Sequence, residues 1–166
     1  LGGSSQEQSW RGSMSVKIDR VHSLATTPAD LVVIPMHVKT MQKPLTLHPT
    51  LHETCLYQYP IAYSHFKDIE SDGTLALGDI IVSERLDRAT VVWLIGRGDI
   101  RRKFDLYAIT KALRQIRELD LHHTYSIAFP AIGYYEEDRI DVKLVYRAVK
   151  KFLGDGLKQV DFLLHY

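Results

Sequence analysis

Two residues that could do chemistry stand just after apolar runs of the sequence. His37 follows Leu31 to Met36, and Arg97 comes two positions after Thr90 to Ile95. A histidine titrates near neutral pH and can act as an acid or a base, whereas an arginine stays protonated and binds anions instead. If both runs are strands, His37 and Arg97 lie at strand carboxyl ends, where open α/β sheets bind ligands. Both are candidate catalytic residues, and which of them acts stays open.

A local group of cations surrounds these positions in the sequence. Five basic side chains fall near the two strand ends and could together neutralise phosphates: Lys39, Lys43, Arg97, Arg101 and Arg102. An alternative interpretation is that Arg101, Arg102 and Lys103 form an ordinary solvated helix entrance.

Other chemical groupings are weaker. His48 and His52 are four residues apart beside Glu53, but Pro49 and the lack of a third ligand argue against a metal site. Cys55 is within reach of His52 on a helix, yet a nucleophile also needs an oxyanion site and an orienting partner, so we expect a buried apolar cysteine. No metal and no cofactor are predicted.

Nucleotide-binding motifs with fixed spacing are absent from the sequence. There is no G-x-x-x-x-G-K-[ST] loop. The nearest approach to a dinucleotide fingerprint is Gly96-Arg97-Gly98, but Arg101 stands where its third glycine belongs. We therefore do not expect a Rossmann enzyme.

Bulk composition fits one cytoplasmic domain. The chain has 166 residues, 45% of them hydrophobic and 25% charged, with a formal net charge of +1. Near neutrality argues against general nucleic-acid or membrane binding, and the single cysteine favours a reducing compartment. Residues 1–13 are rich in Gly, Ser and Gln, and we interpret them as a vector-derived remnant before Met14. Residues 14–166 are expected to form one domain, with no membrane-spanning segment.

Alternating short and long apolar patterns predict a sheet covered by helices. Six strands are expected: Val16–Val21, Leu31–Met36, Asp79–Ser83, Thr90–Ile95, Tyr125–Phe129 and Gln159–Leu164. Helices are expected over Phe104–Leu119, from an Asp138 N-cap to a Gly154 C-cap, and over Pro49–Phe66, where Pro60 divides the helix in two.

Three segments together resemble macrodomains, nearest the branch of DNA ADP-ribosylglycohydrolase antitoxins. They are Thr74–Val82, Gly98–Lys103 with Ile109–Leu113, and Ile127–Gly133, which reads Ile-Ala-Phe-Pro-Ala-Ile-Gly. The resemblance runs from about Val16 to Leu164. It implies a three-layer α/β/α sandwich around a mixed sheet of about six strands, and a site for ADP-ribose.

The residues that this branch uses for its ligand are largely replaced. The resemblance places the adenine-binding Asp at His22, the functional Asn at Met36 and the catalytic Lys at Arg97. Of the glycine-rich loop only Lys43 is kept, while Lys39, Gln42 and Pro44 occupy glycine positions. Backbone amides approach a diphosphate closely only where side chains are absent, and proline donates no amide.

A further change follows Gly133, where the phosphate-binding turn of the family becomes Tyr134-Tyr135-Glu136-Glu137-Asp138. The resemblance thus assigns ligand contacts to His22, Met36, Lys39, Lys43, Arg97, Arg101, Gly133, Tyr134 and Tyr135. It implies binding of ADP-ribose or a related nucleotide, with weak or no ADP-ribosyl hydrolase activity.

Two alternatives stay open. In the first, Met36 and the two tyrosines fill the former ligand volume, and the protein binds another protein or, less expected for a nearly neutral chain, nucleic acid. In the second, His22, His37 or Glu136 acts as acid or base on an unrelated small ligand.

Overall fold

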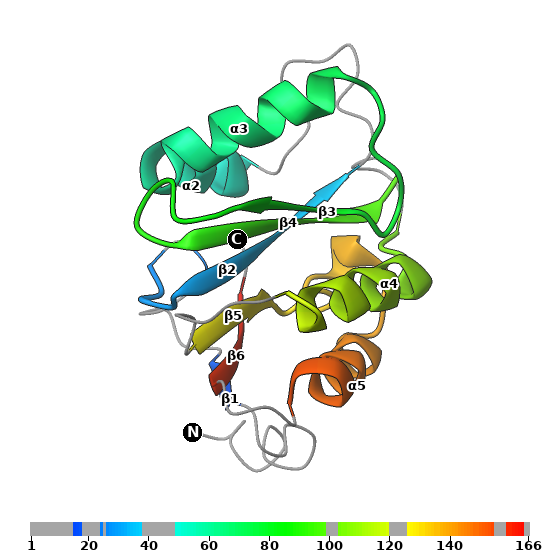
Figure 1. Cartoon of the computed structure of the whole chain (residues 1–166). Coiled ribbons are helices and arrows are strands. Elements are labelled where there is room, and N and C mark those ends of the chain that lie inside the picture. Colours follow the sequence, from blue (N-terminus) through cyan, green and yellow to red (C-terminus); the bar gives the residue numbers. More distant parts are fainter. Residues whose placement is uncertain are drawn as a thin grey trace.

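The computed structural model describes residues 15–17, 24, 26–37, 49–98, 103–119, 126–154 and 159–164. These residues form a mixed six-stranded sheet in the order β1-β6-β5-β2-β4-β3 (Figure 1). All neighbouring strands are parallel except β3 and β4, which are antiparallel. The strands are β1 (Ser15–Lys17), β2 (Leu31–His37), β3 (Ile80–Ser83), β4 (Thr90–Arg97), β5 (Ser126–Pro130) and β6 (Gln159–Leu163).

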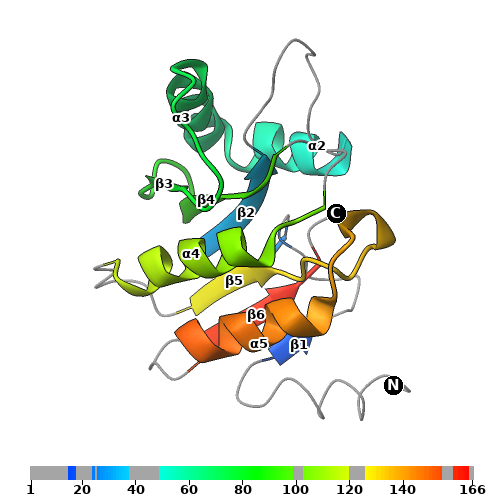
Figure 2. The same ribbon diagram turned by 90° about the vertical axis from the view of Figure 1, so that its right-hand side faces the viewer.

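Helices cover both faces of this sheet. Helices α2 (Pro49–Gln58) and α3 (Pro60–Ser71) lie on one face, and α4 (Leu106–Arg117) and α5 (Val142–Leu153) lie on the other (Figures 1 and 2). The predicted three-layer sandwich and the division of the first helical region at Pro60 are therefore confirmed. No helix within the described ranges is long and apolar enough to cross a membrane.

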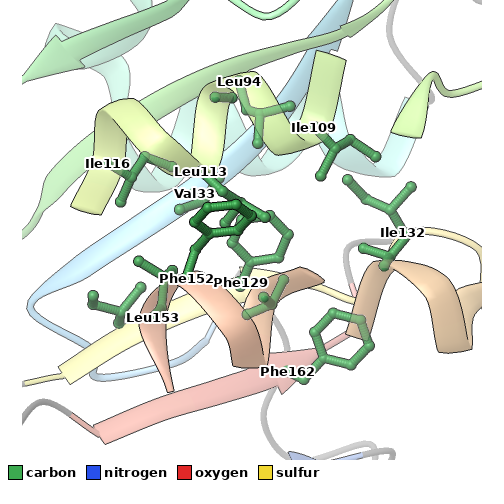
Figure 3. Packing of buried hydrophobic residues seen from close by; sticks show 14 of the residues in the cluster. Val33, Leu94, Ile109, Leu113, Ile116, Phe129, Ile132, Phe152, Leu153 and Phe162 are labelled. Carbon is green, nitrogen blue, oxygen red and sulfur yellow. The ribbon is translucent and has the colours of Figure 1, made fainter. Parts of the chain in front are cut away.

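Strands β2 and β4 are buried at every position, which explains the long apolar run within each of them. Alternate side chains enter two separate cores. The core beneath α4 and α5 contains Val33, Leu94, Phe129 and Phe162 with Ile109, Leu113 and Phe152 from the helices (Figure 3). The core beneath α2 and α3 contains Val32, Ile34, Met36, Trp93 and Ile95 with Cys55, Tyr59 and Phe66. The sheet thus separates the two cores.

The start of α5 differs from the prediction. Asp141, and not Asp138, is its N-cap, because the Asp141 carboxylate accepts a hydrogen bond from Lys143 N at 2.9 Å. Asp138 instead ends a short 3-10 helix, η1 (Glu136–Asp138), and is fully buried. The C-cap at Gly154 is as predicted, and a Cβ there would lie 2.6 Å from Lys150 O.

The amino ends of the central strands are tied by one side-chain pair. Asp30 N donates to Ser126 Oγ at 3.0 Å, and Ser126 N donates to Asp30 Oδ2 at 3.2 Å. The carbonyl oxygen of Asp30 also accepts from Thr90 N at 2.9 Å. Asp30 therefore joins β2 to both of its neighbours, at the end of the sheet opposite His37 and Arg97.

Candidate functional site

The carboxyl ends of β2 and β5 are where the sheet topology favours a ligand. The chain leaves β2 for α2 and α3 on one face, and it leaves β5 for α5 on the other (Figure 2). Open α/β sheets bind ligands beyond the strand ends at such a switch point. In the described ladders, β2 pairs with β5 at Leu31 and Val32, whereas it pairs with β4 from Leu31 to His37. The pairing of β2 with β5 therefore stops well before the end of β2.

Arg97 is a nearly buried cation at the end of β4. It is 8% exposed, and its Cζ lies 4.3 Å from the centre of the Phe104 ring. Gly96 permits this stacking, because a Cβ at Gly96 would lie 2.8 Å from the Phe104 ring. No ion pair or side-chain hydrogen bond of Arg97 is found in the described part of the chain. Its charge is therefore compensated by no carboxylate among these residues.

His37 is the neighbour of Arg97 across the ladder of β2 and β4. The two residues are register partners, and Met36 pairs with Ile95, so that Gly96 is an extra residue in β4. Such a bulge redirects the side chains that follow it. His37 and Met36 are each 2% exposed. The Met36 side chain belongs to the core beneath α2 and α3, so the position aligned with the family's functional Asn is apolar and packed.

The loop after β5 is closed on itself around a buried carboxylate. Gly133 has a φ of +102°, and a Cβ there would lie 2.6 Å from both Ile140 O and Val142 N, so only glycine fits. Gly133 N donates to Asp138 Oδ2 at 2.9 Å. Because Asp138 is fully buried, its carboxylate fixes the loop from inside.

The two tyrosines of this loop contact each other. Their rings are 5.2 Å apart and nearly perpendicular, an edge-to-face arrangement. Tyr134 is 46% exposed, and Tyr135 is partly buried. The next two residues, Glu136 and Glu137, are exposed acids. This side of the loop therefore presents aromatic and negatively charged groups.

Phe104 connects Arg97 to the loop after β5. Phe104 N donates to Asp138 O at 3.1 Å, and the Arg97 guanidinium lies over the Phe104 ring. The next residue, Asp105, donates its N–H to Gly96 O at 2.9 Å. The segment before α4 is thus hydrogen-bonded to both the end of β4 and the loop after β5. We call Met36, His37, Arg97, Phe104, Gly133 and Asp138 the strand-end site.

The structure places only part of the predicted site. The strand-end positions Met36, His37 and Arg97 are brought together, and Gly133 with Tyr134 and Tyr135 is linked to them through Phe104. The other predicted ligand contacts lie outside the described residues: His22, Lys39, Lys43 and Arg101.

Sequence reasoning missed the roles of Phe104, Gly96 and Asp138. Phe104 was expected only to begin a helix, whereas α4 begins at Leu106 with Asp105 as its N-cap. The sequence did contain one signal for the stacking, a glycine directly before Arg97. In the sequence alone, that glycine is part of the incomplete dinucleotide motif Gly96-Arg97-Gly98.

Chemical options at other reactive residues are limited. Burial raises the pKa of the Cys55 thiol to about 12, so a thiolate nucleophile is not available there near neutral pH. The predicted buried apolar role of Cys55 is confirmed. Within the described residues, no group of three or more His, Cys, Asp or Glu side chains could hold a metal ion. The reactive side chains of the strand-end site are therefore the Arg97 guanidinium, the His37 imidazole and the buried Asp138 carboxylate.

Comparison with known proteins identifies the fold. No protein-family model matches the sequence, and no curated protein matches it. Among solved structures, the macrodomain of Thermus aquaticus DarG is 14% identical with a TM-score of 0.70, over 91% of this chain and 97% of that one. The macrodomain of Mycobacterium tuberculosis DarG is 15% identical with a TM-score of 0.66, over 90% and 98%.

A third structure is Thermosipho africanus DarTG in complex with ADP-ribose. It is 14% identical with a TM-score of 0.71, and the match covers 90% of this chain but 41% of that longer one. Likeness at such low identity reports architecture and not chemistry. The chain therefore has a macrodomain fold with DarG macrodomains among its structural neighbours, as the sequence resemblance predicted.

Proposed function

We propose that this chain binds ADP-ribose or a related nucleotide at the strand-end site, with weak or no ADP-ribosyl hydrolase activity. The observation that carries the proposal is Arg97, a nearly buried guanidinium that no carboxylate of the described residues neutralises. It stands at a strand carboxyl end next to the topological switch point. A structural neighbour, DarTG of Thermosipho africanus, is in complex with ADP-ribose, which supports this ligand class.

The energetics favour an anion at Arg97. A charge removed from water is unfavourable unless a counter-charge accompanies it. The guanidinium is planar and keeps its proton, and two of its N–H groups can bind two phosphate oxygens at once. The contact with the Phe104 ring restrains the position of the guanidinium. A phosphate would therefore meet a donor that is already in place.

The expected weakness of hydrolysis follows from what surrounds the guanidinium. Arg97 does not release a proton near pH 7, so it cannot serve as a base. Met36 has no polar atom that could orient a water or a ribose hydroxyl, and it packs in the core. His37 is the remaining acid–base candidate among the described strand-end residues, and at 2% exposure it has little contact with solvent.

Isothermal titration with ADP-ribose tests binding. We expect submillimolar affinity, and Arg97→Ala should weaken it by more than about tenfold, as loss of a hydrogen-bonded charge does. Arg97→Lys keeps the positive charge but loses the paired N–H donors of the guanidinium, so its affinity for ADP-ribose should lie between those of the unmodified protein and Arg97→Ala. Lys43→Ala, a contact expected from the family resemblance, should also weaken binding by more than about tenfold.

Arg114→Ala is the matched control. Arg114 also stacks on an aromatic ring, with its Cζ 5.7 Å from the centre of Phe152, but it is exposed on α4. The affinity of Arg114→Ala for ADP-ribose should equal that of the unmodified protein. If Arg97→Ala is folded by circular dichroism and still binds ADP-ribose with full affinity, the assigned site is wrong.

Hydrolysis is tested separately. Incubation with ADP-ribosylated DNA or protein should release little ADP-ribose, and robust turnover would contradict the argument from Met36 and Arg97. The alternative function, binding of a protein or nucleic acid, draws support from the exposed Tyr134 and the buried Met36. Absence of heat with ADP-ribose, together with a partner captured from extract with and without nuclease, would favour that alternative.

A further inference from the structure

The two helices on one face of the sheet carry charged residues of one sign only. Between its caps, α4 contains three basic residues and no acid, and α5 contains four basic residues and no acid. Helices α2 and α3, on the other face, together contain three acids and one lysine. The formal net charge of +1 for the whole chain therefore includes two helical layers of opposite sign.

The basic residues of α4 and α5 form one surface, because the two helices lie side by side (Figure 2). Arg114 and Lys151 meet across them, with Arg114 Cζ 5.7 Å and Lys151 Nζ 5.5 Å from the centre of the Phe152 ring. Lys111 is set apart, since its Nζ lies 3.9 Å from Asp79. We call the other exposed cations of the two helices the basic face: Arg114, Arg117, Lys143, Arg147, Lys150 and Lys151.

The basic face is concentrated at one end of the helices. Helix α4 joins β4 to β5 and α5 joins β5 to β6, and these strands are all parallel. Both helices therefore run in the same direction, and their last turns lie together at the amino ends of the strands. Four of the six cations stand in these last turns. The strand-end site lies at the opposite end of the sheet.

The helix macrodipole explains only part of this pattern. A cation in the last turn of a helix is favourable, which accounts for the four cations found there. It does not account for Lys143, which stands in the first turn of α5, or for Arg147 in the middle of that helix. Arg147 is also four residues from both Lys143 and Lys151, and such like-charge pairs destabilise a helix. The arrangement is therefore unfavourable unless an external anion compensates it.

The described part of the chain supplies little negative charge to the basic face. Five of its cations form no ion pair with any described residue: Arg114, Lys143, Arg147, Lys150 and Lys151. The acids that adjoin the two helices are cap residues at the helix ends: Asp105, Glu118 and Asp141. The centre of the basic face is therefore positively charged.

The side chains around these cations discriminate between classes of polyanion. A stable protein interface needs an apolar centre, and a helix that binds a membrane inserts apolar side chains. The exposed large apolar residues of these helices are Tyr107 and Leu144, both in first turns and away from the four cations of the last turns. Single-stranded nucleic acid stacks on exposed aromatic rings, whereas Tyr146 and Phe152 are buried. A rigid array of phosphates fits better than any of these three.

From these observations we infer that the basic face binds the phosphate backbone of a nucleic-acid duplex without reading its sequence. Each helix has 12 residues and is about 18 Å long, and phosphates recur about every 3.4 Å along one DNA strand. One helix therefore spans about five base pairs. This surface is separate from the strand-end site and does not depend on the function proposed for that site.

Fluorescence anisotropy of a labelled, mixed-sequence DNA duplex of about 20 base pairs tests the inference, since this length exceeds the span of either helix. At about 50 mM salt the duplex should bind with micromolar or tighter affinity. The logarithm of the association constant should fall with the logarithm of salt concentration with a slope of about −4, as four or five phosphate contacts require. No binding at this salt concentration, or tighter binding of the matching single strand, would overturn the inference. Polyglutamate or phosphatidylserine vesicles that bind more tightly than the duplex would overturn it too, and would identify another class of partner.

Arg147→Gln and Lys151→Gln locate the binding surface. Each should weaken duplex binding by at least about threefold and reduce the salt slope by about one, because one phosphate contact is lost. Lys67→Gln is the matched control, since it removes one positive charge from an exposed position on α3. Its affinity for the duplex should equal that of the unmodified protein. Equal losses in all three variants, each folded by circular dichroism, would show that overall charge and not the basic face determines binding. Because no ADP-ribose is used, the result is independent of the proposed function.

Discussion

Replacing Gly133 by alanine tests how tightly the loop after β5 is built. Gly133 has a φ of +102°, and a new Cβ would meet backbone atoms on three sides, with Ile140 O and Val142 N at 2.6 Å and Val142 Cα at 2.7 Å. Gly73 is the matched control. It also has a positive φ, +71°, but nothing lies within 4 Å of a Cβ built there. The pair separates backbone strain from steric overlap.

The two effects have different sizes. An alanine in the left-handed region costs about 1–2 kcal/mol, which is the whole expected effect of Gly73→Ala. Overpacking against atoms that cannot move aside adds about 1–3 kcal/mol, so Gly133→Ala should cost about 2–5 kcal/mol in total. For a domain of this size, the midpoint of thermal unfolding should fall by about 4–20 °C for Gly133→Ala and about 2–8 °C for Gly73→Ala.

Urea denaturation of the three proteins gives the free energies of unfolding directly. The difference between the two variants should be about 1–3 kcal/mol, since their shared strain cancels. Equal losses within about 0.5 kcal/mol would show that the loop relaxes around the Cβ at no cost. That result would contradict the inference that the hydrogen bond from Gly133 N to Asp138 holds the loop rigidly.

Two further predictions concern stability. The Asp87 carboxylate accepts hydrogen bonds from Ile61 N at 3.3 Å and Ala62 N at 2.9 Å at the start of α3. Asp87→Ala should therefore lower the free energy of unfolding, measured by urea denaturation, by about 1 kcal/mol. An unchanged free energy of unfolding would show that water replaces these two hydrogen bonds at no cost. Burial raises the pKa of Cys55 to about 12 from an ordinary 9.0, and raises those of Tyr59 and Tyr63 to about 12. The unfolded chain loses these protons at a lower pH than the folded protein does. The contribution of these groups to the free energy of unfolding should therefore be fully present below pH 9 and should be lost as pH rises toward 12. Urea denaturation at several pH values from about 8 to 11 gives the free energy of unfolding against pH, and this free energy should fall less steeply in Cys55→Ala than in the unmodified protein. An equal slope in the two proteins would contradict the raised pKa of Cys55.

The central strands and the main helices could be predicted because their signals are local and periodic. Strand β2 is apolar from Leu31 to Met36 because both of its faces are buried, and the stripe of α4 at Ile109, Leu113 and Ile116 repeats with the helical period. Boundaries were less exact. Both β2 and β4 extend into His37 and Arg97, since the ladder continues past the last apolar residue.

The contacts within the candidate site could not be predicted in the same way, because they join segments that are distant in sequence. Asp138 and Asp141 both fit the pattern of a helix N-cap, and only the fold shows that the first of them faces Gly133 instead. The stacking of Arg97 on Phe104 depends on Gly96 and on where the segment before α4 lies. The strand-end positions were predictable from topology, whereas the partners of their charges were not. The roles predicted for His22, Lys39, Lys43 and Arg101 stay predictions.

Burial of β2 on both faces has a consequence for how the sheet aligns. In a strand with one wet face, a slip by one residue would expose apolar groups, and this penalty fixes the register. Over Leu31 to Met36, a slip in β2 would exchange apolar side chains between two apolar cores, so hydrophobicity alone discriminates weakly between registers there. The side-chain hydrogen bonds between Asp30 and Ser126 form in one alignment of β2 with β5 only. This side-chain pair at the amino ends therefore selects the alignment of β2 with β5, the two strands whose carboxyl ends flank the switch point.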